Sequence, residues 1–241
     1  MRTGLLVLLI LTLAAFPAAA GADDELERLT VEYAHEPLGL DVEQPRFGWR
    51  LERDVLQRAY QVQVASSEHA LRSGRADVWD SGRVESGDSA QVAYGGAPLQ
   101  PATRYHWRVR VWTGDRASSW STSEWETGLL GEAAWRGARW IGRGEDGAAP
   151  RLRREFRLDE RVERARLYVS GLGHYEARIN GERVGDQVLD PGHTDYDDSV
   201  LYAAHDVTRL VRRGANALGV ELGTGWYDVR TGNVWDWHNA P

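Results

Sequence analysis

The sequence predicts an all-β protein built from two consecutive antiparallel β-sandwiches. Runs in which apolar and polar residues alternate with a period of two recur along the chain, as in residues 104–112 and 174–179. Gly, Pro, Asn and Asp separate these runs at short intervals, which is typical of sandwiches with many turns. Only residues 67–74 have a pattern that predicts a helical turn or two.

Length, composition and charge limit the classes of function. The 241 residues, 42% hydrophobic and 27% charged, fit one large or two ordinary globular domains. The formal net charge of −7 argues against a nucleic acid or an anionic membrane as partner, because both require a basic face. With no cysteine, the chain has no disulfide and no thiolate metal site.

Residues 1–20 have the pattern of a secretory signal peptide. Arg2 supplies the positive start, residues 5–16 the apolar stretch, and residues 18–20 small side chains suited to cleavage. The alternative is a transmembrane anchor, but the apolar run is shorter than the ~20 residues that span a bilayer. We therefore expect a secreted or periplasmic protein with no membrane contact after cleavage.

The first sandwich is expected over residues 24–130. Period-2 runs occur at residues 46–51, 59–65, 89–94 and 104–112. An aromatic strand at 105–111, a polar turn at 118–121 and a closing strand at 124–128 together resemble a fibronectin type III domain. Tyr105, Trp107 and Val109 fall on one face, which predicts core packing, and Trp49, Trp79 and Trp112 are expected in the core or between domains.

Residues 131–150 are expected to form a connector. Trp135 and Trp140 are predicted to pin it to a flanking domain, while residues 142–150 have loop composition. Residues 142–147 match GxGxxG, but Glu145 and Asp146 would repel a pyrophosphate and Pro150 follows too closely for a helix. We therefore expect no dinucleotide site there.

The second sandwich is expected over residues 151–241. Strand-like runs occupy residues 152–158, 165–170, 174–179, 200–205 and 216–222, and Asn180-Gly181 predicts a two-residue hairpin turn. About six strands fit before Leu222, whereas an eight-stranded jelly roll needs more chain. The pattern therefore predicts a jelly-roll β-sandwich that is incomplete at Pro241.

Aspartates in the loop that follows this hairpin are the first candidate site. Asp186, Asp190 and Asp195 stand beside Gly, Pro and Thr, where aspartates commonly build turns. A second interpretation is carbohydrate binding, or a calcium site at Asp186 and Asp190, because carboxylates are ligands for hard cations and accept sugar hydroxyls. A third, catalysis, stays open from the residues alone.

Aromatic residues near the end of the chain are the second candidate. They are the cluster Trp226, Tyr227, Trp235 and Trp237, whose tryptophans lie in Gly-rich, irregular sequence, where their rings can stack on the C–H faces of a sugar. The alternative is burial against a neighbouring domain, which gains hydrophobic free energy in proportion to area.

Short motifs along the mature chain occur in a characteristic order. They are EPLGLD (36–41), PRFGW (45–49), WDSGRV (79–84), TGLL (127–130), WIG (140–142), SGLG (170–173), ING (179–181), VGD (184–186), LDPG (189–192), TDY (194–196), DVT (206–208) and LGTGWY (222–227). In this order they resemble the N-terminal, non-catalytic region of bacterial α-L-rhamnosidases of glycoside hydrolase family 78.

The resemblance implies an exported enzyme that releases terminal α-L-rhamnose from glycosides with inversion. In such a mechanism two carboxyl groups lie roughly 6.5–9.5 Å apart, one protonating the leaving oxygen and one activating water. In the family these groups lie on an (α/α)6 barrel that follows the β domains. No helical-hairpin pattern is present here, so no catalytic residue is assigned and the chain alone is expected to be inactive.

The resemblance also keeps the sugar and calcium interpretations open, because some members carry a calcium-dependent rhamnose-binding module. The implied partners are a rhamnose-containing glycan and a C-terminal catalytic module missing from this sequence; no cofactor is required. The rival hypothesis is a free-standing rhamnose-binding protein. A third, an adhesion module of tandem sandwiches, is disfavoured because nothing repeats between the two halves.

Overall fold

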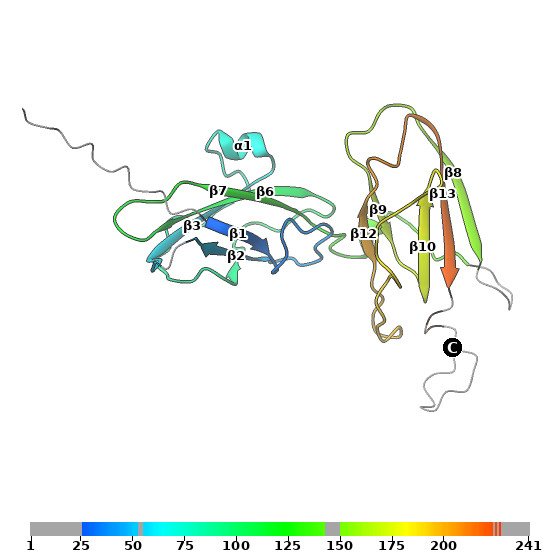
Figure 1. Ribbon diagram of the computed structural model, residues 1–241, viewed down its shortest axis with the longest axis horizontal. Coiled ribbons are helices and arrows are strands. Elements are labelled where there is room, and N and C mark those ends of the chain that lie inside the picture. Colours follow the sequence, from blue (N-terminus) through cyan, green and yellow to red (C-terminus); the bar gives the residue numbers. More distant parts are fainter. Residues whose placement is uncertain (1–25, 53–54, 143–149, 224, 226, 228–241) are drawn as a thin grey trace, which may run out of the picture.

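The computed structural model describes residues 26–52, 55–142, 150–223, 225 and 227, and confirms the all-β prediction (Figure 1). Within these residues the only helices are α1 (Glu68–Arg72) and the short 3-10 helix η1 (Glu132–Trp135). Ser67 caps α1 by accepting a hydrogen bond from the Ala70 N–H at 3.2 Å. Neither described helix is long and apolar enough to cross a membrane. The predicted signal peptide at residues 1–20 lies outside the described residues.

The first sandwich consists of two antiparallel sheets. One sheet has the order β1-β2-β5 and the other the order β4-β3-β6-β7. The strands are β1 (Leu26–Val31), β2 (Arg46–Leu51), β3 (Ala59–Ala65), β4 (Trp79–Asp80), β5 (Val92–Ala93), β6 (Arg104–Trp112) and β7 (Ser121–Glu126). The long pairing of β3 with β6, from Ala59↔Trp112 to Ala65↔His106, forms the centre of the larger sheet.

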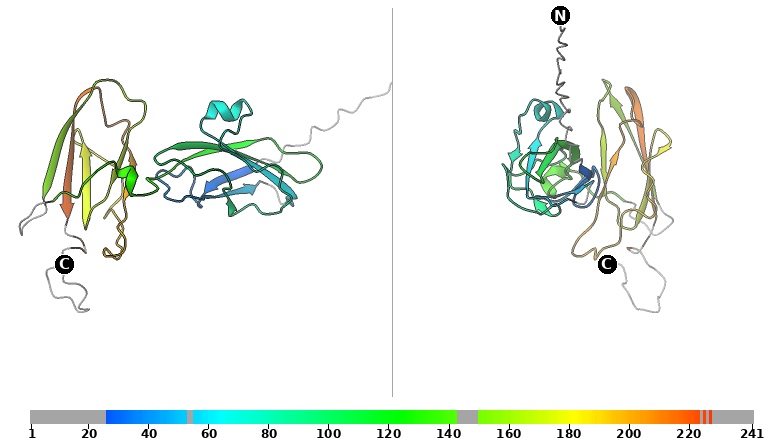
Figure 2. Two further views of the ribbon diagram at one scale, coloured as in Figure 1. Left: turned by 180° about the vertical axis from the view of Figure 1, so that it is seen from behind. Right: turned by 60° about the vertical axis from the view of Figure 1, so that its left-hand side comes forward.

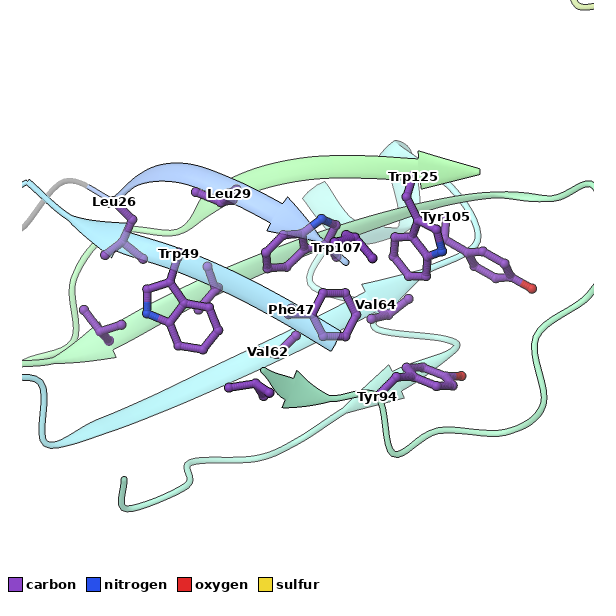
Figure 3. Packing of buried hydrophobic residues seen from close by; sticks show 14 of the residues in the cluster. Leu26, Leu29, Phe47, Trp49, Val62, Val64, Tyr94, Tyr105, Trp107 and Trp125 are labelled. Carbon is purple, nitrogen blue, oxygen red and sulfur yellow. The ribbon is translucent and has the colours of Figure 1, made fainter. Parts of the chain in front are cut away.

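Aromatic side chains fill the space between these two sheets (Figure 3). Along β6 the alternating pattern buries Tyr105, Trp107 and Val109, as the sequence predicts. The Phe47 ring lies 4.7 Å from that of Trp107 and 5.5 Å from that of Trp125, centroid to centroid. Burying a side chain of the size of phenylalanine stabilises a fold by about 1.5–3 kcal/mol, so this cluster dominates the first core.

On the outer face of β6, arginine guanidinium groups stack on two indole rings. The guanidinium carbons of Arg108 and Arg110 lie 4.3 and 4.5 Å from the Trp120 ring centroid. Arg83 and Arg110 lie 4.8 and 5.0 Å from the Trp112 centroid. Each of these indoles therefore has a face covered by a guanidinium, and that face is not open to a sugar ring.

The second sandwich is built from a sheet of order β11-β10-β13-β8 and a two-stranded sheet, β12-β9. The strands are β8 (Arg151–Leu158), β9 (Arg166–Val169), β10 (His174–Ile179), β11 (Glu182–Arg183), β12 (Ala203–Asp206) and β13 (Gly214–Gly223). Asn180 (φ 54°) and Gly181 (φ 90°) form the predicted two-residue turn between β10 and β11. The buried core is smaller than the first and contains Ala177, Ile179, Val184 and Val207.

The two sandwiches lie end to end, with the end of β7 and the following segment against β9 and β12 (Figures 1 and 2). In the connector, Trp135 packs edge-on against Tyr202 of the second sandwich, with centroids 5.4 Å apart. The corresponding prediction for Trp140 is wrong, because its side chain is 64% exposed. Residues 136–142 are all exposed, so no described element covers that indole.

Candidate functional site

Asp190 belongs to a buried cluster of three polar side chains at one end of the second sandwich. Its carboxylate Oδ2 accepts a short hydrogen bond from the Tyr175 hydroxyl of β10. The Tyr175 Oη and His205 Nε2 atoms are 3.0 Å apart, and His205 Nε2 lies 3.6 Å from Asp190 Oδ2. Since the phenol gives its only proton to the carboxylate, the imidazole Nε2 donates to the phenol oxygen.

The backbone fixes this cluster as firmly as the side chains do. The Tyr175 N–H donates to the Asp190 carbonyl at 3.0 Å, which ties the loop after β11 to the start of β10. Gly185 lies against the His205 ring, where an added Cβ would come within 2.8 Å of Nδ1, and its φ is +69°. Only a residue without a side chain fits between that loop and the imidazole.

Burial raises the pKa of Tyr175 well above its usual range, and the hydrogen bond to the Asp190 carboxylate raises the pKa further. The phenol therefore keeps its proton and acts as a donor at all ordinary pH values. His205 is 5% exposed and the Asp190 side chain 18% exposed. The cluster is thus built to hold a loop in place, with little of the carboxylate open to solvent.

Asp195 builds a turn in the same loop. Its carbonyl accepts hydrogen bonds from Asp198 N at 3.1 Å and Ser199 N at 2.8 Å, and its Oδ1 accepts from Asp197 N at 3.2 Å. This is the side-chain-to-backbone pattern of an aspartate turn, the first of the three interpretations of these aspartates. Its carboxylate stays at the surface.

Asp186 is exposed beside Gly185, and the structure does not draw it into the Asp190 cluster. Among the described residues, no group of three or more His, Asp or Glu side chains is arranged to hold a metal ion. The nearest charged or hydrogen-bonding neighbours of Asp190 Oδ2 are a phenol and an imidazole rather than further carboxylates. The calcium site at Asp186 and Asp190 therefore stays a prediction.

Trp226, Trp235 and Trp237 lie outside the described residues, so Tyr227 is the one described member of the aromatic cluster. The Tyr227 ring packs edge-on against Tyr196 at 5.6 Å, and Tyr196 against His193 at 5.4 Å, centroid to centroid. This row of rings joins the loop carrying Asp195 to the segment after β13. Tyr196 is not among the site residues predicted from the sequence, although it lies in the TDY motif next to Asp195.

Three motifs that are far apart in the sequence meet at this end of the sandwich. A Cβ at Gly171 would lie 3.1 Å from Tyr175 Cδ1 and 3.8 Å from Pro191 Cδ, so SGLG contacts LDPG. A Cβ at Gly225 would lie 2.7 Å from the Cα of Gly173, so LGTGWY contacts SGLG. The glycines of these motifs therefore allow three loops to pack at backbone distance.

Comparison with known families and proteins agrees with this architecture. Residues 26–131 match the family described as Rha78A-like, N-terminal immunoglobulin domain, and residues 160–240 match the alpha-L-rhamnosidase N-terminal domain. Immunoglobulin and fibronectin type III domains share the two-sheet sandwich architecture, in agreement with the first sandwich described above.

Individual relatives are α-L-rhamnosidases. One from Formosa agariphila is 37% identical over 90% of this chain and 25% of its own length. The solved α-L-rhamnosidase of Dictyoglumus thermophilum is 41% identical, with a TM-score of 0.79 over 84% of this chain and 25% of that one. The Aspergillus terreus α-L-rhamnosidase structure is 36% identical, with a TM-score of 0.72 over 87% of this chain and 25% of its own.

The chain spans about a quarter of the length of these relatives. Its described residues contain one α-helix of five residues and therefore no helical barrel. Both β domains match families named for the N-terminal parts of rhamnosidases. The chain therefore belongs to the α-L-rhamnosidase family and carries its two N-terminal β domains.

Proposed function

We propose that this chain is the N-terminal β portion of an exported enzyme that hydrolyses terminal α-L-rhamnosides with inversion. We further propose that hydrolysis depends on carboxylates of a catalytic barrel outside these residues. The observation that carries this proposal is the use of the candidate aspartates in building the fold. Asp190 is engaged with Tyr175 and His205, and Asp195 forms a turn.

An inverting glycosidase needs an acid and a base on opposite faces of the sugar, with room for a water between them. A carboxylate that accepts a buried phenol proton is not free to protonate a leaving oxygen. The described residues thus support a scaffold rather than a catalytic centre. Residues 1–20 support export by their signal-peptide pattern.

The test is an assay of the purified chain with p-nitrophenyl α-L-rhamnoside. We expect no release of p-nitrophenol above that of a matched variant in which Asp186, Asp190 and Asp195 are all alanine. If the unaltered chain hydrolysed the substrate and the variant did not, catalysis would lie in this loop and the proposal would be overturned.

A second candidate function is rhamnose binding by the same loop, with or without calcium. It is favoured by the exposed Asp195 carboxylate beside the Tyr196–Tyr227 ring pair. Carboxylates accept hydroxyl hydrogens, and aromatic faces pack against the C–H groups of a sugar.

Calorimetric titration of the whole chain with L-rhamnose, with and without calcium chloride, tests this function. We expect the unaltered chain to bind L-rhamnose with measurable heat. We expect Asp195→Ala to weaken the affinity at least tenfold. Asp159→Ala is the matched control, because the β8–β13 register puts Leu158 opposite Gly214, at the other end of the sheet from Gly223 and His174. No heat under either condition would leave only the scaffold function.

A further inference from the structure

A buried carboxylate connects the two sandwiches. Glu126, at the end of β7, has a side chain that is 4% exposed, and it faces Arg166 of β9, which is 9% exposed. Arg166 Nε donates to Glu126 Oε1 at 2.9 Å and Arg166 Nη2 donates to Oε2 at 2.9 Å. This two-pronged geometry is the strongest that a guanidinium and a carboxylate form.

Further charges surround this pair from both domains. Arg164 Nη1 lies 3.4 Å from Glu126 Oε2, and Arg104 Nε of β6 lies 3.9 Å from the same oxygen. Arg166 Nη1 is also 3.0 Å from Asp206 Oδ2 of β12. Three arginines and two carboxylates thus form one network across the domain boundary.

The Glu126 side chain has little freedom to leave this network. The backbone N–H of Glu126 donates to the Pro37 carbonyl at 2.9 Å, and the backbone carbonyl of Glu126 accepts from Leu40 N at 2.9 Å. The charge therefore sits on a backbone held on two sides, and separation of the domains would leave Glu126 beside Arg104 but without Arg166. Removing the charge of Glu126 while Arg166 stays buried in the joint is strongly destabilising, because it leaves a buried charge without its partner.

Tyr202 makes a second, uncharged joint. Its hydroxyl accepts a hydrogen bond from Leu129 N at 2.7 Å, and the next N–H, that of Leu130, donates to Asp41 Oδ1 at 2.6 Å. Burial raises the pKa of Tyr202 to about 12, so the phenol stays neutral. An added Cβ at Gly128 would overlap this hydroxyl.

We propose that the Glu126 network and Tyr202 join the two sandwiches into one cooperative folding unit. Glu126 and Arg166 are the positioning residues that set the angle between the domains. Each domain supplies the partner that makes a buried charge of the other tolerable, so unfolding of either one destabilises the other. This property is independent of hydrolysis and of sugar binding.

Differential scanning calorimetry of the whole chain tests the proposal. We expect one transition with a van't Hoff enthalpy equal to the calorimetric enthalpy, the sign of two-state unfolding. In Glu126→Gln we expect two separate transitions and an unfolding equilibrium constant for the less stable domain at least tenfold larger. Two transitions in the unaltered chain would overturn the proposal.

Glu124→Gln is the matched control. Glu124 lies two residues earlier on the same face of β7 and pairs with His106 and Arg104 inside the first sandwich, with its side chain 32% exposed. It should keep the single transition, and equal behaviour of the two variants would contradict a special role for Glu126. If Glu126→Gln does not fold, Tyr202→Phe serves instead, because it removes only the hydroxyl at the joint; an unchanged single transition there would count against the proposal.

Discussion

Tyr175, Asp190 and His205 show how one aspartate acquires a role that its neighbours in sequence do not reveal. The sequence indicates Asp190 because it stands in a polar loop with other aspartates. Its partners are 15 residues before and 15 residues after it, on β10 and β12. The strand register and the packing of the sheets bring these three residues together. Neither can be inferred from a local sequence pattern. The same reasoning succeeds for Asp195, because a turn is built from adjacent residues.

Tyr175→Phe should destabilise the chain by about 1–3 kcal/mol, the usual cost of leaving a buried polar partner unsatisfied. The phenol is the donor to the Asp190 carboxylate and the acceptor for His205, so both lose a partner. Urea unfolding of the whole chain measures the change.

Tyr33→Phe is the control for this substitution, since Tyr33 is 66% exposed and its ring centroid lies 5.5 Å from the guanidinium carbon of Arg46. We expect it to stay within about 0.5 kcal/mol of the unaltered chain. A loss for Tyr175→Phe no larger than that of Tyr33→Phe would mean that the cluster does not hold the loop.

Long strands are the elements that the sequence predicts best. The period-2 runs at 104–112 and 174–179 coincide with β6 and β10, because each strand has one buried face along its length. Strands β4, β5 and β11 contain two residues each, and a strand of two residues is too short to show the alternation of apolar and polar side chains. Their positions depend on the neighbouring strands.

Two predicted strands begin earlier in the sequence pattern than in the structure. The run at 89–94 contracts to β5 (Val92–Ala93), because Gln91 has a φ of +57° that interrupts an extended backbone. The run at 200–205 contracts to β12 (Ala203–Asp206), and Leu201 is 47% exposed outside it. In both cases the alternation of side chains continues past the point where the backbone leaves the sheet.

Motif order and composition suffice to predict the all-β class and the family of the whole molecule, but they do not predict the joint between the domains. Glu126 lies in a stretch whose pattern indicates only a closing strand, and Arg166 in one that indicates only a strand of the second sandwich. Their pairing across 40 residues depends on how two finished sandwiches meet. A contact of that kind leaves no period and no local motif in a single sequence.

The position of the two sandwiches relative to each other should not change with salt concentration. Exposed pairs such as Arg151–Glu221, whose side chains are 80% and 54% exposed, are screened once the Debye length falls to about 3 Å near 1 M salt. The Glu126–Arg166 pair is shielded from ions by its burial and is reinforced by direct hydrogen bonds. Small-angle X-ray scattering of the whole chain should therefore give the same radius of gyration in 0.05 M and about 1 M sodium chloride.

The Glu126→Gln variant gives this scattering measurement its contrast. A neutral amide cannot form the charged two-pronged pair, and Arg104 of the first sandwich then repels Arg164 and Arg166 of the second across the boundary. We expect a larger radius of gyration for this variant at low salt, and a decrease toward the unaltered value as salt screens the repulsion. Expansion of the unaltered chain in high salt would show instead that exposed charges hold the domains together, and that the buried pair does not fix their angle.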